Sequence, residues 1–296
     1  MLQIIIGILL LMTAFFAVVF FKDYIKTSKE GELEKTNFFA LGAVGAVTNF
    51  FDTLGIGSFA TTTALLKSFH LTEDRTIPGT LNVACTIPVV VEAVIFITVI
   101  KVEPVTLIAM LVAATVGAVV GAGFVSNLNE RKVELGMGTA LIVVALIMLS
   151  GQLHLTPAGG TAIGLTGGAF IIGVVGNFIL GALMTLGIGL YAPCLALVYA
   201  LGMSPKVAFP IMMGSCAFLM TAASTKFVKE GAYDRKASMA ITIFGLVGVL
   251  IAAYIVKTLP LNILIWIVIV VIFYTSILMF RSASRHIKKE QPILQK

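Results

Sequence analysis

The sequence has few charged residues, and most of those it has are gathered in short segments. Charged side chains make up 11% of the 296 residues, whereas a soluble protein carries about 25%. No Asp, Glu, Lys or Arg occurs between Leu135 and Pro205. Since one membrane crossing needs about 20 apolar residues, this run alone holds about three crossings. The mean hydropathy of +1.07 agrees with this estimate, and the chain is predicted to be a polytopic membrane protein.

Cysteine and histidine are also scarce, with three residues of each. Cys85, Cys194 and Cys216 lie in apolar segments, and the sequence has no C-x-x-C motif and no Cys/His cluster. Neither a disulfide framework nor a metal site is therefore indicated. No two histidines stand four residues apart, which argues against a zinc hydrolase, and no P-loop is present. We expect no cofactor, and a transport activity would be driven by a gradient or by a partner.

The basic residues lie in short polar segments and in the C-terminal tail. We count five membrane segments in each half of the chain, where the short piece after each break is either a full span or a re-entrant half-helix. Most of the basic residues then fall on one side. Only Lys101, Lys206 and Lys257 fall on the other. Because Lys and Arg mark cytoplasmic loops, this predicts a cell-membrane protein with a cytoplasmic C-terminus and an external N-terminus. The expected partners are the lipid bilayer and a small substrate, with no nucleic acid, and a homo-oligomer is left open.

Two glycine pairs interrupt long apolar segments, Gly55-Ile56-Gly57 and Gly187-Ile188-Gly189. Each glycine weakens a helix by about 1 kcal/mol relative to Ala. A broken helix inside a membrane is tolerated where its backbone lines a cavity or is buried in protein. When one half of the chain is laid on the other so that the two glycine pairs coincide, Pro78 falls on Pro210 without a gap. This match is called the repeat alignment below, and we expect each proline to open the helix that follows its break.

These features predict an all-α membrane protein with two inverted repeats, Gly-broken helices and an extra N-terminal transmembrane helix. Residues 2–21 lack a positive start and an A-x-A site, so they are expected to be a retained helix and not a signal peptide. The expected division has four parts: residues 1–36, this helix with a polar cytoplasmic linker; residues 37–152, the first repeat; residues 163–280, the second repeat; and residues 281–296, a basic cytoplasmic tail.

Over residues 38–280 the chain resembles the TauE/SafE family of sulfite-exporting membrane permeases. Both halves carry a Gly-rich break, a short apolar piece that ends in a polar turn, and a helix that starts near a proline. The family's usual run, Gly-x-Gly-Gly-Gly before a Pro, is thinner here, with Thr61 in the first copy and Pro193 in the second at the proline position. The resemblance implies transport of a small anion such as sulfite, a sulfonate or a related organic acid.

The predicted substrate site combines the two breaks with nearby hydroxyl and amide side chains. Helix N-termini expose N–H groups and a partial positive charge, which suits an anion. The alternative is that the glycines are packing contacts and the hydroxyls bond to their own helices. The predicted substrate-binding residues are Gly55, Gly57, Ser58, Thr61, Thr62, Thr80, Asn82, Gly187, Gly189 and Pro193.

Asp52 and Glu92 are the acidic residues of apolar segments, and we predict that one of them, with Asp52 favoured because it lies beside the first break, takes up a proton or helps bind a cation coupled to transport. An acidic side chain near the bilayer centre costs about 2.5–3.5 kcal/mol, so it faces a cavity, pairs with a cation or relays protons. The alternative for Asp52 is a place near the membrane interface or an ion pair with Lys67. Acidic groups also repel an anionic substrate, and the sequence alone does not resolve this conflict.

Other function classes are weighed against the transporter. An intramembrane thiol enzyme or sulfur-relay protein would use Cys85, Cys194 or Cys216, but a reactive thiol needs a neighbouring base or cation, and none is adjacent in the sequence. A permease for a cation or metal would suit the acidic residues. A scaffold or sensor has no large extramembrane domain to support it. The leading prediction is a secondary transporter that is not an enzyme.

Overall fold

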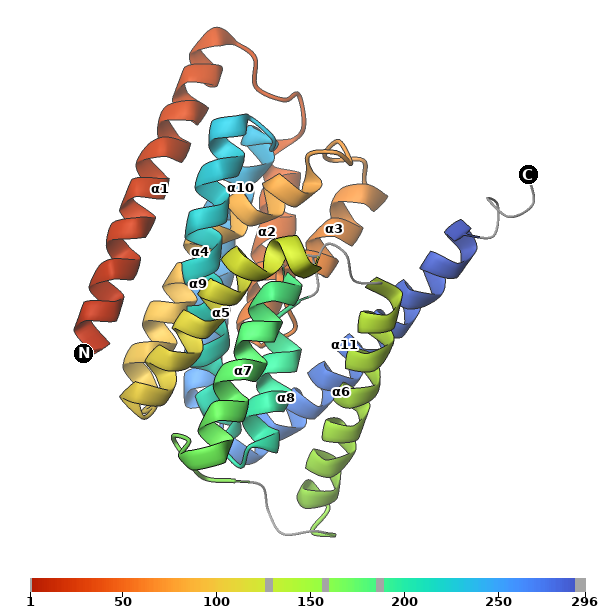
Figure 1. Cartoon of the computed structure of the whole chain (residues 1–296). Helices are drawn as coiled ribbons and strands as arrows, with labels where there is room; N and C mark the ends of the chain where they lie inside the picture. Colours follow the sequence, from red (N-terminus) through yellow and green to blue (C-terminus); the bar gives the residue numbers. More distant parts are fainter. Residues whose placement is uncertain (1, 126–129, 156–159, 185–188, 291–296) are drawn as a thin grey trace.

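The structure is a computed structural model that describes residues 2–125, 130–155, 160–184 and 189–290. In these ranges eleven helices run side by side or cross, and no strand is formed apart from one isolated bridge (Figure 1). In chain order the helices are α1 (Leu2–Glu30), α2 (Phe38–Thr53), α3 (Ser58–Ser68), α4 (Ile77–Val99), α5 (Pro104–Val125), α6 (Glu130–Gln152), α7 (Gly167–Met184), α8 (Tyr191–Ala200), α9 (Pro205–Glu230), α10 (Arg235–Thr258) and α11 (Leu261–Glu290).

Seven helices of the described chain are long and apolar enough to cross a membrane: α1, α4, α6, α7, α9, α10 and α11. The apolar helix α2 and the short helix α8 fall below that length, as does the apolar stretch Pro104–Val120 in α5. The predicted all-helical polytopic membrane protein is thereby confirmed. The division into four parts stays a prediction.

The first glycine break forms a hairpin that returns to the end of the bundle from which it started. The Asn37 side chain begins α2 by accepting hydrogen bonds from the amides of Phe39 and Ala40, at 2.9 and 3.2 Å. Beyond α3, the carbonyl of Leu71 accepts a hydrogen bond from the Thr36 hydroxyl at 3.2 Å. Since this bond joins the chain before α2 to the chain after α3, the pair α2–α3 is re-entrant.

The helices α7 and α8 form a second hairpin of the same kind. The amide of Ser204, after α8, donates to the carbonyl of Ala162, before α7, at 2.9 Å. The mouth of a hairpin is the end at which the chain enters and leaves it. At the mouth of α7–α8, the amide of Glu103, just beyond the end of α4, donates to the carbonyl of Ile163 at 2.8 Å. At the mouth of α2–α3, Asp234 accepts from the Thr72 hydroxyl and donates its amide to Thr80, which lies near the start of α4. The two hairpins therefore open at opposite ends of α4 (Figure 1).

Helix partners exchange between the halves in a regular way. Helix α2 packs on α10 and α7 packs on α5, while α4 packs on α9 and α6 on α11. Glycines permit the closest approaches, because a Cβ at Gly248 would overlap the carbonyl of Ala46 and one at Gly117 would overlap that of Phe178. If α2 corresponds to α7, α5 to α10, α4 to α9 and α6 to α11, exchanging the two halves leaves this set of pairs unchanged, as expected for two copies of one arrangement. The inverted relation of the two halves stays a prediction.

The expectation that Pro210 opens a helix is wrong. Helix α9 begins at Pro205, and Pro210 lies inside it. Pro205 fits the first helical position because its missing N–H has no partner there. Pro210 then leaves the carbonyl of Lys206 without its usual intrahelical bond. Pro78, in contrast, lies at the start of α4 as expected.

Candidate functional site

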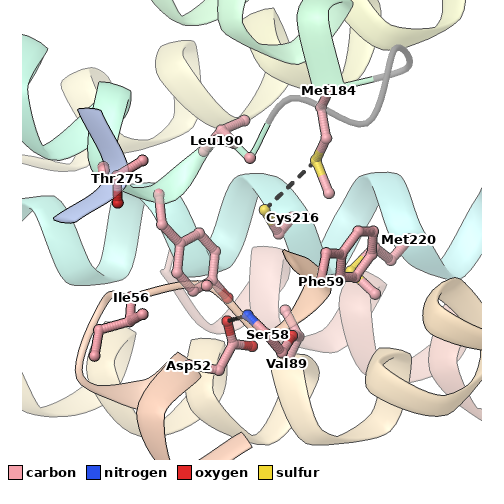
Figure 2. Close-up of a pocket in the computed structure, with 14 residues that line it drawn as sticks. Asp52, Ile56, Ser58, Phe59, Val89, Met184, Leu190, Cys216, Met220 and Thr275 are labelled. Carbon is pink, nitrogen blue, oxygen red and sulfur yellow. Dashed lines mark hydrogen bonds between the residues drawn. The ribbon is translucent and has the colours of Figure 1, made fainter. Parts of the chain in front are cut away.

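A small cavity lies where the turns of the two hairpins meet (Figure 2). Its volume is about 60 Å³. Helices from both halves line it. The lining residues are Asp52, Ile56, Gly57, Ser58, Phe59, Val89, Met184, Gly189, Leu190, Tyr191, Ala192, Cys216, Met220 and Thr275.

Asp52 stands at the end of α2 and closes the first turn. One carboxylate oxygen accepts a hydrogen bond from the amide of Ser58, the first residue of α3, at 2.7 Å. The turn between them needs the left-handed backbone at Gly55 and Gly57, whose φ angles are 95° and 86°. The second oxygen of Asp52 is buried and has no hydrogen-bond partner among the described residues. Asp52 therefore offers one free acceptor or donor position at the cavity.

Glu92 connects three helices beside this cavity. It is fully buried on α4, and its two oxygens accept from the Thr53 hydroxyl at 2.7 Å and from the Tyr191 hydroxyl at 3.2 Å. Thr53 ends α2, and Tyr191 begins α8. A single carboxyl group thus joins the end of α2 in the first hairpin to the start of α8 in the second.

No Lys or Arg lines the cavity in the described part of the chain. Lys67 instead pairs with Asp74, with 3.4 Å between the ammonium and the carboxylate, and both side chains are at least half exposed. The alternative in which Asp52 pairs with Lys67 is therefore wrong. The two buried carboxyl groups have hydroxyl and amide partners but no cationic one among the residues described.

Sulfur atoms form another side of the cavity. The thiol of Cys216 donates to the sulfur of Met184 at 3.7 Å (Figure 2), and Met220 lies beside them. Cys85 accepts from the Ser58 hydroxyl at 3.7 Å, and all three cysteines are free and buried. A nucleophilic thiol needs an adjacent cation or base, which these partners do not supply. No group of three His, Cys, Asp or Glu side chains that could hold a metal occurs among the described residues.

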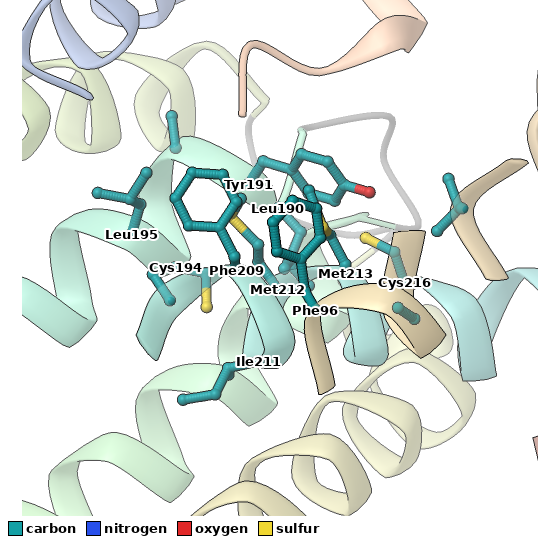
Figure 3. Close-up of a cluster of buried hydrophobic side chains, with 14 of the residues drawn as sticks. Phe96, Leu190, Tyr191, Cys194, Leu195, Phe209, Ile211, Met212, Met213 and Cys216 are labelled. Carbon is teal, nitrogen blue, oxygen red and sulfur yellow. The ribbon is translucent and has the colours of Figure 1, made fainter. Parts of the chain in front are cut away.

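An apolar cluster surrounds Tyr191, the hydrogen-bond partner of Glu92 (Figure 3). The rings of Phe96 and Phe209 stand 5.3 Å apart, and Met212 and Met213 continue the cluster along α9. Phe96 lies one helical turn beyond Glu92 on α4. The aromatic pair therefore forms a dry layer next to the Glu92–Tyr191 bond.

The structure brings some of the predicted site residues to the cavity and leaves others away from it. Asp52, Gly57, Ser58 and Gly189 line the cavity, and Glu92 binds one of its lining side chains. Gly187 lies outside the described residues. Gly55 shapes the turn without lining the cavity. Pro193 is buried inside α8 and is likewise absent from the lining.

The remaining predicted residues have local or distant partners. The Thr61 hydroxyl donates to the carbonyl of Ser58, its own helix, at 2.9 Å, and Thr62 is buried with no partner for its hydroxyl in the part of the chain that is described. Thr80 accepts from the amide of Asp234 at 2.9 Å, near the mouth of the first hairpin. The Asn82 amide donates to the carbonyl of Pro78 at 2.9 Å. For Thr61 and Asn82 these are the self-bonded arrangements weighed in the sequence analysis.

Sequence reasoning missed Thr53, Tyr191 and Thr275. The sequence does contain a signal for Tyr191. The repeat alignment places it on Phe59, so the second copy has a hydroxyl that the first copy lacks. Thr275 belongs to α11, and its hydroxyl is buried without a partner in the described structure. Neither Thr53 nor Thr275 carried a signal, because threonines are frequent in apolar helices as packing residues.

Comparisons with known proteins give one family. A family model described as "Sulfite exporter TauE/SafE" matches residues 1–148 and 153–295. No curated protein matches the chain.

Proposed function

The chain belongs to the TauE/SafE family of sulfite exporters, which are membrane transporters, and from this premise we propose a specific transport mechanism. The cargo is a small anion such as sulfite, a sulfonate or a related organic acid. It crosses the cell membrane by alternating access, and protons carried by Asp52 and Glu92 accompany it. The observation that supports this proposal is a cavity between two hairpin turns with two buried carboxyl groups beside it and no cation among its described lining residues.

Protons resolve the conflict between an anionic cargo and an acidic site. Two negative charges a few ångströms apart repel strongly where water is scarce. When Asp52 is protonated, its free oxygen becomes an O–H donor on the same cavity as the unpartnered hydroxyl of Thr275. The N-terminus of α3, which already holds Asp52 through Ser58, adds the partial positive charge of a helix start. Anion binding and proton uptake then favour each other.

The two hairpins supply the moving parts. Their mouths lie at opposite ends of α4, and their turns meet at the Glu92–Tyr191 hydrogen bond. Displacement of α2–α3 would open the cavity toward one end of the bundle, and displacement of α7–α8 would open it toward the other. A broken helix whose turn lines a central cavity is the arrangement on which many secondary transporters rely.

Sulfite flux into proteoliposomes tests this function. We expect an imposed pH gradient to drive sulfite accumulation by the unaltered protein. Asp52→Asn and Glu92→Gln keep hydrogen bonding but have no group that gains and loses a proton in this pH range, so each variant should equilibrate sulfite without accumulating it. Glu103→Gln is the matched control, because Glu103 caps α5 away from the cavity. Accumulation that ignores the gradient, or that both variants retain, would contradict proton coupling.

The acidic and sulfur-rich lining favours a cation permease as the second candidate. Asp52 offers an unpaired oxygen, and Met184 and Cys216 offer soft donors on the same cavity. Thiol and thioether ligands select soft monovalent ions such as Cu(I). Flux of Ag(I), measured in the same liposomes, separates the two candidates: silver flux without sulfite flux would favour the cation permease.

A further inference from the structure

A second, larger pocket opens beside the mouth of the α7–α8 hairpin. Its volume is about 380 Å³, within the range of small-molecule sites. The ends of α4 and α10 and the starts of α9 and α11 surround it. The lining residues are Phe96, Val99, Ile100, Lys101, Thr161, Ile163, Ser204, Lys206, Val207, Phe209, Val256 and Leu264.

Two lysines give this pocket a positive charge that no described side chain neutralises. Neither Lys101 nor Lys206 forms an ion pair within the described ranges. The acidic residue that follows in the chain, Glu103, is engaged elsewhere, because it accepts from the amides of Val105 and Thr106 at 3.0 and 2.6 Å. These N–H groups hold the pKa of Glu103 below its ordinary value, so it stays an anion bound to the start of α5.

The mouth of the first hairpin has the opposite pattern. Basic side chains there stand next to acidic ones, as in Lys67–Asp74 at 3.4 Å and Arg75–Glu73 at 2.8 Å. The repeat alignment places Lys206 at the position of Asp74, so the charge changes sign between the two copies. At this aligned position the positive charge is therefore a property of the second mouth and not of the repeated plan.

The pocket also lies next to the transport site. Phe96 and Phe209, the aromatic pair beside the Glu92–Tyr191 bond, form its inner wall. Figure 3 shows the two rings next to Tyr191, and along the chain Phe96 lies between Glu92 on α4 and Lys101 just beyond that helix. A ligand held by the lysines would wait at the entrance to the central cavity.

We propose that the pocket between Lys101 and Lys206 captures a small oxyanion before it enters, or after it leaves, the central cavity. The two ammonium groups provide the charge, and the hydroxyls of Thr161 and Ser204 provide hydrogen-bond donors. A pocket lined by one sign of charge concentrates the oppositely charged solute. The assignment of an oxyanion as cargo rests on the proposed function.

The test compares sulfite binding and sulfite flux in a double variant, Lys101→Gln with Lys206→Gln. Binding is read from the rise of the unfolding temperature in sodium sulfite over sodium chloride of equal ionic strength. We expect the half-effective sulfite concentration to rise about tenfold, the low end of the enrichment by a charged cleft. The flux at saturating sulfite should stay unchanged, because the central cavity is intact. Lys226→Gln removes one positive charge from the exposed pair with Glu230 and should have no effect.

The outcomes separate this proposal from the proposed function. The capture site is overturned if sulfite stabilises the double variant as it does the unaltered protein, or if it stabilises neither. Sulfite binding that depends on the two lysines, in a protein that moves no sulfite, would keep the capture site and refute the transport proposal. A variant with Lys101→Arg and Lys206→Arg keeps both charges and should retain binding, which excludes general misfolding as the cause.

Discussion

The two hairpins follow one plan but are buried to different extents. Eight of the ten residues of α8 are buried, whereas only Ser58, Thr62 and Leu66 are buried in the eleven residues of α3. Helix α8 packs on α9 and α7 and is also covered by α6 and α11, which lie beside it in Figure 1, while α3 packs mainly on α2 and α4. The second helix of the hairpin is thus mostly buried in one copy and mostly unburied in the other.

The two hairpins also differ in the polar side chains that they bring to the cavity. The first hairpin brings Asp52 and Ser58 to the cavity, whereas the described part of the second brings Leu190 and the hydroxyl of Tyr191. Local opening is easiest where few apolar contacts must break. The comparison therefore suggests a division of labour in which α2–α3 moves and exchanges protons while α7–α8 gives the cavity its shape. Four predictions test this comparison.

The largest effect is expected where each hairpin is anchored. Gly248→Ala would push α10 from α2, because the new Cβ would overlap the carbonyl of Ala46, and Gly117→Ala would push α5 from α7 at Phe178. Each should lower the free energy of unfolding by about 3 kcal/mol, since backbone atoms must shift. Thermal unfolding in detergent measures the loss.

Gly136→Ala is the matched control for both substitutions. Nothing lies within 4 Å of a Cβ at Gly136, so this change should raise stability by about 1 kcal/mol through helix propensity. Similar losses at Gly248 and Gly117 would show that both hairpins are anchored alike and differ only in their second helices. A loss at one of them alone would place the asymmetry in the anchors.

The second prediction concerns how each mouth is tied. At the mouth of the first hairpin the contact is made by a titratable side chain. The Asp234 carboxylate accepts from the Thr72 hydroxyl, after α3, at 3.2 Å and from the amide of Ala237, in α10, at 2.7 Å. The equivalent position to Thr72, Ser204, is tied by its backbone to Ala162. Burial raises the pKa of Asp234 to about 6. The folded state therefore holds its proton more tightly than the unfolded chain.

It follows that Asp234 contributes stability below about pH 4, which is lost as the pH rises through 6. Asp234→Asn caps α10 about as well but does not titrate. Relative to this variant, the unaltered protein should lose about 2 kcal/mol between pH 4 and 7. The measurement is the unfolding temperature of both proteins over that pH range. If the difference between them does not vary with pH, the predicted role of Asp234 is refuted. Ser204→Ala, at the other mouth, should leave the pH profile unchanged.

The sequence predicts the breaks and the acidic residues well, because glycine pairs and charges are costly inside apolar helices and therefore stand out there. It does not distinguish a span from a re-entrant hairpin, since hydropathy measures length and not direction. Thr80 and Asn82 were predicted at the site because they follow the break closely in sequence. Helix α4 rises by about 1.5 Å per residue, so Thr80 lies about 18 Å from Glu92 along its axis. The Glu92–Tyr191 contact joins residues 99 positions apart, which no local pattern predicts.

The third prediction removes the polar group of the second hairpin. Tyr191→Phe deletes the hydroxyl that donates to Glu92 at 3.2 Å and keeps the ring. Proton-driven sulfite flux should fall about tenfold, which corresponds to about 1.4 kcal/mol for one hydrogen bond to an acidic group. Tyr199→Phe makes the same deletion in the same helix, outside the cavity lining, and should leave flux intact. Unchanged flux in Tyr191→Phe would mean that the second hairpin contributes only to the shape of the cavity.

The smallest effect is expected at Thr62, where the two copies differ by one buried side chain. The repeat alignment places Thr62 on Cys194, and the Thr62 hydroxyl is buried without a partner in the described structure. Thr62→Val keeps the shape and removes an unsatisfied polar atom, so stability should change by less than about 0.5 kcal/mol or rise. Sulfite flux should stay the same, because Thr62 does not line the cavity. A loss of flux would instead mean that α3 turns during transport and brings this hydroxyl to the substrate, which would extend the polar role of the first hairpin beyond its turn.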